Sequence, residues 1–296
     1  MSLKITHRFF QKHPLTKHDI LAAWWRFGKW QIRSRINKGY FEYPFIENSR
    51  LWVKNGMTGA TGNIYAGLHE FEDMAFLLHC IRQEDLFLDV GANIGSYTVL
   101  ASAVARAKSF CFEPVPATFK ILEKNIEINS IENLVTAFNN GVGNKQEKLS
   151  FTDTADTVNH VVLDTATEDS VVEIDVEILD QIIPDNNQAM IMKLDVEGFE
   201  KHALEGAERL LHNHFLKAII VELNGCCHRY GVREEEIHEL LLSYGFLAYD
   251  YDPFKRTFKA ISNFHNEGNT LYIRDIDWVQ DRVTQSRKFK AVGKEF

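Results

Sequence analysis

Cysteine is scarce in this chain of 296 residues, and long uninterrupted runs of apolar residues are missing. The four cysteines form neither a C-x-x-C pair nor the regular spacing of a secreted disulfide domain, which favours a reducing compartment. No stretch approaches the roughly eighteen consecutive apolar residues of a membrane-spanning helix, and no apolar segment of signal-peptide type opens the sequence. We therefore expect a cytoplasmic protein without a transmembrane segment.

Positive charge is also in deficit, because 33 Lys and Arg residues face 41 Asp and Glu residues, for a formal net charge of −8. A general nucleic-acid binder needs a basic surface to neutralise phosphates, so no nucleic-acid partner is expected. The twelve histidines include no H-E-x-x-H or other tight ligand spacing, so the sequence predicts no zinc site.

The most informative segment is residues 85–95, where an apolar stretch containing Asp89 runs into a glycine turn. Buried strands of parallel sheets are short apolar runs, and glycine lets the backbone turn sharply close to a ligand. The residues from Ser96 onward have helical periodicity, and a second apolar strand then ends at Glu113. Together these segments predict a βαβ unit that binds its ligand outside the carboxyl ends of its strands.

The spacing of the glycines indicates which ligand fits. Dinucleotide folds use G-x-G-x-x-G so that the backbone can touch a pyrophosphate, whereas Asn93 replaces the middle glycine between Gly91 and Gly95. No GK[ST] follows, which excludes a P-loop. An acid about twenty residues beyond such a loop commonly accepts hydrogen bonds from ribose hydroxyls, so Glu113 predicts a nucleoside ligand.

The rest of the chain alternates β and α segments up to about residue 275 and closes with a β pair. This pattern predicts an α/β fold with a doubly wound, mostly parallel sheet and an antiparallel edge strand, over residues 69–275. Residues 1–68 are expected to form an N-terminal extension of helix, hairpin and glycine-rich loop. Residues 276–296 are expected to form a C-terminal tail.

Three segments outside the nucleoside site attract attention. Residues 18–38 predict a basic amphipathic helix, which either contacts a membrane surface or an anionic substrate, or packs on its own domain with Lys and Arg in solvent. The glycines between residues 56 and 67 predict a loop that could close over a site. The acidic stretch of residues 164–180 predicts a strand with one wet face.

Three segments together resemble the FkbM-type methyltransferases of the class I superfamily: LDVGANIGSYT at residues 88–98, FEP at 112–114 and MKLDVEGFE at 192–200. GNTLY at residues 268–272 is similar to that family as well. The resemblance implies a Rossmann-like domain with a seven-stranded sheet and S-adenosylmethionine as the methyl donor. It also implies a small-molecule or glycan acceptor, usually a hydroxyl on a sugar, glycan or secondary metabolite.

The resemblance also suggests roles for individual residues. The catalytic candidates are Asp195, Glu197 and Glu222, since each lies at or just after the carboxyl end of a predicted strand and a hydroxyl acceptor calls for a base. His228 is a further candidate base. For Asp195 and Glu197 the alternative is a purely structural role at the start of the next helix. The residues expected to bind the cofactor are Asp89, Gly91, Ala92, Asn93, Gly95, Glu113, Gly141, Val142 and Asp195.

Several alternatives remain open at this point. Asp195, Glu222 and Asn224 could offer oxygen ligands to Mg²⁺, although we assign no metal residues. The fold could also bind S-adenosylmethionine without turnover, or methylate nitrogen in another small molecule. Aromatic residues of the extension could stack on a sugar or bury in a homodimer contact.

Overall fold

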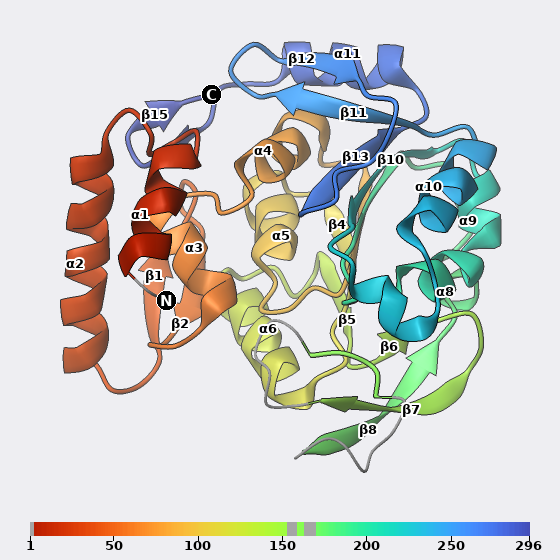
Figure 1. Cartoon of the computed structure of the whole chain (residues 1–296), viewed down its shortest axis with the longest axis horizontal. Coiled ribbons are helices and arrows are strands. Elements are labelled where there is room, and N and C mark those ends of the chain that lie inside the picture. Colours follow the sequence, from red (N-terminus) through yellow and green to blue (C-terminus); the bar gives the residue numbers. More distant parts are fainter. Residues whose placement is uncertain (1–2, 153–158, 163–169) are drawn as a thin grey trace.

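The computed structural model describes residues 3–152, 159–162 and 170–296, and its centre is an eight-stranded sheet (Figure 1). Five neighbouring strands are parallel, and the other three pair antiparallel at one side. In sheet order the strands are β12 (Thr257–Ala260), β11 (Leu247–Asp252), β13 (Asn269–Ile273), β10 (Leu216–Glu222), β9 (Met190–Leu194), β3 (Leu86–Val90), β4 (Lys108–Phe112) and β5 (Val135–Phe138).

This sheet confirms the predicted α/β, doubly wound and mostly parallel fold. It has one strand more than the expected seven, because β12 forms a hairpin with β11 and adds an antiparallel strand at the edge. A second antiparallel strand, β13, lies inside the sheet between β10 and β11.

Helices cover both faces of the sheet, and the alternation of side chains along the strands decides which face each residue joins. Phe87, Ile191 and Ile220 pack with one group of helices, and Leu88 and Met192 pack with the other. The first group is α4 (Phe71–Cys80), α5 (Ser96–Val99), the π-helical η1 (Leu100–Val104) and α11 (Ile276–Gln285). The second group is α7 (Leu179–Ile182), α8 (Glu200–Glu205), α9 (Glu208–His212) and α10 (Glu234–Ser243).

The remaining elements lie around the sheet. Helix α6 (Pro116–Ile128) connects β4 to β5, and the one-turn helix η4 (Cys226–Tyr230) follows β10. A separate small sheet contains residues 171–177 of the acidic stretch, and residues 164–169 of that stretch lie outside the described residues. Its strands are β6 (Gly141–Val142), β8 (Val171–Glu177) and β7 (Glu147–Thr152), and the chain ends in the hairpin of β14 (Lys290–Ala291) and β15 (Lys294–Glu295).

The N-terminal extension packs directly on the sheet domain. Phe10, Trp30 and Ile64 share one buried cluster with Ile94 and Val99, which follow β3. The predicted amphipathic helix is present as α2, and Asp19 caps its first turn by accepting a hydrogen bond from the Ala22 amide. The extension consists of α1 (Leu3–Lys12), α2 (Ile20–Ile36), the hairpin of β1 (Phe41–Pro44) and β2 (Arg50–Val53), and α3 (Thr58–Ala66).

The glycine-rich segment is helical, so the prediction of a loop at residues 56–67 was wrong. Gly62 lies in α3, where an added Cβ would come within 2.2 Å of the His69 ring. This glycine therefore serves close packing, and tertiary contacts override its low helix propensity. The segment does lie beside the predicted site, because Gly59 and Asn63 line the cavity described next.

Candidate active site

A cavity of about 300 Å³ opens at the carboxyl ends of β3, β4, β9 and β10. It extends from Glu113 at the end of β4 to Glu222 at the end of β10. Of the expected cofactor-binding and catalytic residues, Gly95 and His228 lie outside its wall, and the others line it: Asp89, Gly91, Ala92, Asn93, Glu113, Gly141, Val142, Asp195, Glu197 and Glu222. The strand ends thus bring together residues that are up to 133 positions apart in the sequence, from Asp89 to Glu222.

The two glycines of the loop after β3 are required for different structural reasons. Gly91 has φ +82°, and an added Cβ would lie 1.7 Å from the backbone oxygen of Asp195, so it allows the ends of β3 and β9 to touch. Gly95 has φ +84° and precedes α5, where an added Cβ would meet Leu122 at 2.4 Å. Gly95 therefore allows close packing against α6 and does not line the cavity.

Asp89 is almost completely buried at the end of β3. Its carboxylate accepts a hydrogen bond from the Thr98 hydroxyl of α5, which fixes the strand to the helix that follows the glycine turn. Burial raises the pKa of Asp89 to about 6.

Glu113 reaches back from the end of β4 to the glycine loop. One carboxylate oxygen accepts from the Asn93 amide at 3.0 Å, and the other accepts from the Val115 amide at 2.9 Å. Glu113 is only 6% exposed, and this burial raises its pKa to about 7. Each oxygen keeps a second lone pair, so the side chain can accept further hydrogen bonds from a ligand in the cavity.

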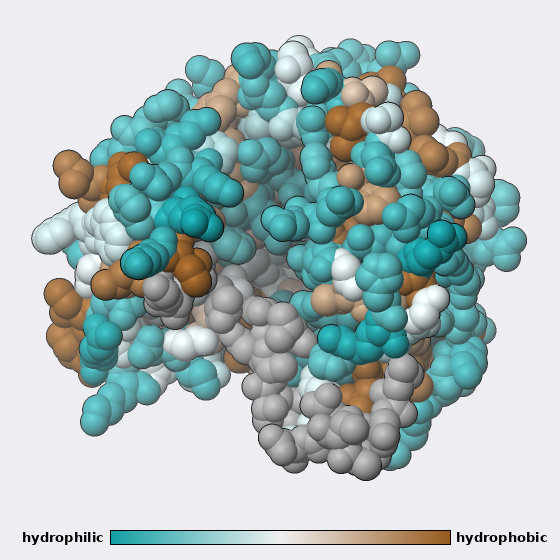
Figure 2. Space-filling model, viewed as in Figure 1, coloured by the Kyte–Doolittle hydropathy of each residue, from teal (hydrophilic) through white to brown (hydrophobic). Residues whose placement is uncertain are grey.

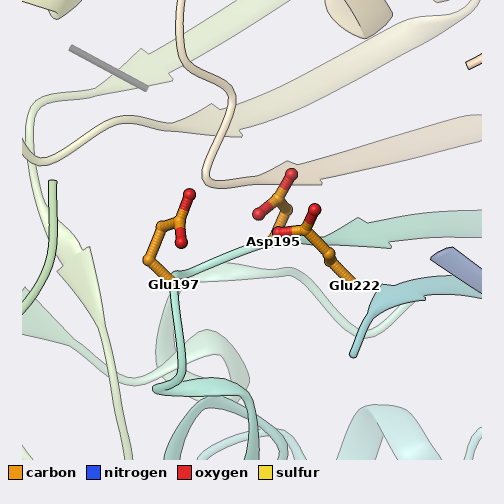
Figure 3. Close-up of side chains that lie close together, drawn as sticks. All are labelled: Asp195, Glu197 and Glu222. Atoms are coloured by element: carbon orange, nitrogen blue, oxygen red, sulfur yellow. The ribbon is translucent and has the colours of Figure 1, made fainter. Parts of the chain in front are cut away.

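At the opposite end of the cavity, Asp195, Glu197 and Glu222 each offer a carboxylate oxygen within 4.8 Å of the other two (Figure 3). Asp195 and Glu222 come from neighbouring strand ends and share a hydrogen bond, so one of them holds a proton. Burial and the charge of Asp195 raise the pKa of Glu222 far above its ordinary value. Glu222 is therefore the protonated partner and Asp195 the ionised one.

Lys193 accounts for this distribution of charge. Its ammonium lies 3.0 Å from an Asp195 carboxylate oxygen, and its side chain is only 2% exposed. Burial raises the pKa of Asp195 and the ammonium of Lys193 lowers it, with the net shift downward. For Lys193 itself, burial lowers the pKa, but the charges of Asp195 and Glu70 outweigh burial and raise it. The pair is a partly buried ion pair that faces the cavity, with Asp195 the more exposed partner.

Glu197 differs from its two neighbours. Burial, followed by the charge of Asp195, raises its pKa to about 7, so it exchanges a proton near neutral pH. Its backbone has φ +52°, an uncommon conformation for a residue with a side chain, and the Cys226 thiol points to its carboxylate at 3.8 Å. Such strain in a cavity wall is typical of functional residues.

Several cavity residues were missing from the prediction. Lys193 is one, and its signal was its position as the single charged residue of an apolar strand. Glu70 is another, since its carboxylate accepts a hydrogen bond from the Tyr97 hydroxyl instead of capping α4. Asn63 of the extension donates to Ser96 at 3.1 Å. His228, a candidate base, is exposed and does not line the cavity.

A metal ion has one candidate position within the described ranges of the chain, the cluster of Asp195, Glu197 and Glu222. The Lys193 ammonium already neutralises Asp195 there, and Glu222 is protonated. A divalent ion would have to displace both the lysine and the proton.

An open α/β sheet with an acid-lined cavity at the carboxyl ends of its middle strands, and a buried acid beside a glycine turn, defines a nucleoside-binding α/β protein. The Methyltransferase FkbM domain matches residues 89–248, which is more than half of the sequence, so the chain belongs to this family of methyltransferases. Membership of this family confirms the expected enzyme class, a methyltransferase, and with it the expected donor, S-adenosylmethionine.

Two curated relatives are similar to this chain. "Methyltransferase 1" of Beauveria bassiana is 25% identical over 176 residues, which cover 52% of this chain and 70% of the relative. The hexuronic acid methyltransferase AglP of Haloferax volcanii is 27% identical over 181 residues, which cover 58% of this chain and 67% of the relative.

Solved structures are more distant. An rRNA methylase from Streptococcus thermophilus aligns with a TM-score of 0.40 and 13% identity, covering 68% of this chain and 93% of the other. A Streptococcus mutans protein in complex with SAH aligns with a TM-score of 0.42 and 11% identity, covering 68% and 95%.

Proposed function

We propose that this protein transfers the methyl group of S-adenosylmethionine to a hydroxyl oxygen of a sugar, a glycan or a similar small acceptor. The observation that carries the proposal is the acid cluster opposite Glu113. It combines an ionised Asp195, a protonated Glu222 and a Glu197 that titrates near neutral pH around one end of a cavity.

The donor fits the cavity by its chemistry. S-adenosylmethionine supplies an electrophilic methyl group on a positively charged sulfur, and an acid-lined wall favours such a cation. In the proposal, Glu113 accepts hydrogen bonds from the ribose hydroxyls, and Asn93 is fixed beside it by its amide contact. Asp89 and the loop residues Gly91 and Ala92 border the methionine and ribose, and Gly141 with Val142 lies beside adenine. Gly95 supports this loop from behind.

The acceptor side needs a base, because an alkyl hydroxyl is a weak nucleophile until its proton leaves. Glu197 suits this role since its pKa of about 7 lies near the working pH. Asp195 is held ionised by Lys193 and is therefore a weaker base, better suited to orient the acceptor. Glu222 can donate a hydrogen bond to Asp195 and keeps that carboxylate in place.

A sugar acceptor is supported by the name of one relative, the hexuronic acid methyltransferase of Haloferax volcanii. The polar groups around the cavity agree with such an acceptor. His69 and Asn224 line the same cavity and add a polar ring and an amide to its wall. Glu197 supports oxygen as the methylated atom, since a neutral hydroxyl needs a base.

The test is release of S-adenosylhomocysteine from the purified protein with a panel of hexoses, hexuronic acids, phenols and amines. We expect turnover with the sugars and a methyl ether in the product by NMR. Tight donor binding with no product on any acceptor would favour the alternative of a binding protein without turnover. Product from amines alone would contradict oxygen transfer.

A further inference from the structure

Helix α2 presents apolar side chains on two opposite faces. Its inner face packs into the extension through Ala23 and Trp30, which are 0% and 2% exposed. Its outer face remains open to solvent. The outer residues are Leu21 at 84% exposed, Trp25 at 66%, Ile32 at 63% and Ile36 at 74%.

These four side chains form one stripe, because their spacing of four, seven and four residues returns to the same side of an α-helix. In the space-filling view, apolar surface lies along the left edge, where Figure 1 places α2 (Figure 2). Soluble surfaces usually scatter single apolar residues, whereas a continuous stripe of large ones marks an interaction site. Packing within the described part of the chain therefore accounts for the inner face of α2 and leaves the outer stripe exposed.

Basic residues flank the stripe. Lys29 and Arg35 are exposed beside it, and the Lys29 ammonium lies 5.1 Å from the centre of the Trp25 ring. The charge of this segment opposes that of the rest of the chain. Residues 1–38 contain nine basic residues and one acidic residue, a formal charge of +8, so with a total of −8 the remaining residues carry −16.

The apolar stripe and the positive charge beside it together favour one kind of partner. A second copy of the stripe would bring two strongly positive segments together, which disfavours self-association. RNA would bind the positive charge, but it offers no apolar surface to cover exposed leucine and isoleucine side chains. We propose that α2 lies flat on an anionic lipid membrane, with Leu21, Trp25 and Ile32 in the acyl boundary and the basic side chains at the headgroups. Among the described helices, none has the length and apolar content to cross a bilayer.

The first experiment is sedimentation of the full chain with vesicles of phosphatidylcholine alone or mixed equally with phosphatidylglycerol. Binding to the mixed vesicles is expected, with weak binding to phosphatidylcholine and loss of affinity as salt rises. Brominated lipids should quench tryptophan emission, and Trp25→Phe should remove most of this quenching. Equal binding to both vesicle types, or no binding to either, would overturn the proposal.

Variants separate the two components of binding. Leu21→Ser and Ile32→Ser should each weaken vesicle binding by roughly tenfold. Lys29→Gln and Arg35→Gln should each weaken it by about fivefold. Leu247→Ser in β11 and Lys259→Gln in β12 are matched controls at exposed positions and should change nothing.

Two further outcomes would contradict a membrane partner. A gel shift with RNA that the lysine and arginine variants abolish, and that Leu21→Ser leaves intact, would show a nucleic-acid surface. A dimer in solution that Trp25→Ser dissociates would show a self-association face. Far-UV circular dichroism of each variant checks that α2 is retained.

Discussion

Three neighbouring acids hold different protonation states because their surroundings differ. Asp195 lies 3.0 Å from the Lys193 ammonium and stays ionised, while Glu222 has no such cation as close and keeps a proton. Glu197 has an uncommon backbone φ of +52°, and burial raises its pKa to about 7. The division of roles proposed above follows from these surroundings, since side-chain type alone would make all three equivalent.

Glu197→Gln tests the assignment of the base. The amide keeps the shape of the side chain but cannot take a proton, so kcat should fall by about 10²–10⁴ while donor affinity is unchanged. In the wild-type protein, the rate should rise with pH through about 7, as the carboxyl of Glu197 ionises. Both are measured as S-adenosylhomocysteine release across pH.

Glu235→Gln, on the exposed face of α10, is the matched control and should keep the full rate. If Glu197→Gln weakens donor binding as much as it lowers kcat, the side chain positions the donor and does not act as base. An unchanged rate would transfer the role to another residue.

Glu113→Gln tests the donor site. A glutamine side chain cannot accept at both positions that Glu113 uses, so donor binding should weaken by about 1–3 kcal/mol, measured by calorimetry. The wild-type affinity should also decrease as pH falls below about 7, because a proton on the Glu113 carboxyl occupies a lone pair that would otherwise accept a hydrogen bond from a ribose hydroxyl. The exposed Glu123→Gln is the control on α6. Equal affinity in all three proteins, at every pH, would exclude Glu113 from the site.

At the scale of the elements, the contact between the ends of β3 and β9 gives the cavity its shape. Gly91→Ala should destabilise the folded protein, because the new methyl group would meet the Asp195 backbone oxygen and the residue would keep a positive φ. We expect a loss of about 2–4 kcal/mol in the free energy of unfolding, measured by urea denaturation. Gly28→Ala in α2 is the control, since nothing lies within 4 Å of its added Cβ. That variant should be neutral or slightly more stable. A Gly91→Ala protein as stable as wild type would contradict the tight contact.

The strands and their ends could be predicted because a short apolar run that ends in an acid is typical of a buried parallel strand at a binding edge. Asp89, Glu113 and Asp195 were therefore located correctly at the sheet edge. Helix α3 could not be predicted, since its glycines disfavour a helix and the close contact of Gly62 with His69 requires one of them. That contact joins segments whose relative position depends on the whole fold.

Contacts between distant segments account for the features that sequence patterns did not indicate. The pairing of Glu70 with Tyr97 links α4 to α5, and no local pattern reveals it. The protonated state of Glu222 depends on Asp195, which comes from a different strand. Sequence patterns thus indicated the positions of the acids, while their protonation depended on tertiary neighbours.

At the scale of the whole molecule, the methyltransferase domain and its flanking segments pack as one structure. Asn63 of the extension lines the cavity, and Phe289 and Phe296 of the last segment are buried in the cluster that contains α4. The boundaries at residues 68 and 275 stay predictions about where the domain begins and ends. The packing nevertheless makes the site depend on residues from both sides of the first boundary.

Buried acids should make the stability of the ligand-free protein decrease with rising pH. Glu113 and Glu200 are 6% and 3% exposed, and burial raises the pKa of each to about 7. In the unfolded chain, these groups lose their protons near pH 4, so only the folded state must release them between about pH 6 and 8. Their stabilising contribution is complete at low pH and is lost as pH rises through about 7.

Urea denaturation between about pH 6.5 and about pH 8 should therefore show a decrease of about 1 kcal/mol for each of these two acids. The buried His13 and His79, whose pKa values are lowered to about 4 and about 3 by burial, oppose this trend only below about pH 6.5. Glu200→Gln keeps an acceptor for the Gly198 amide and should reduce the slope. Saturating S-adenosylmethionine should reduce the slope further, because hydrogen bonds from its ribose hydroxyls would favour the ionised form of Glu113. A slope that neither change affects would mean that these two acids do not titrate near neutral pH in the folded protein.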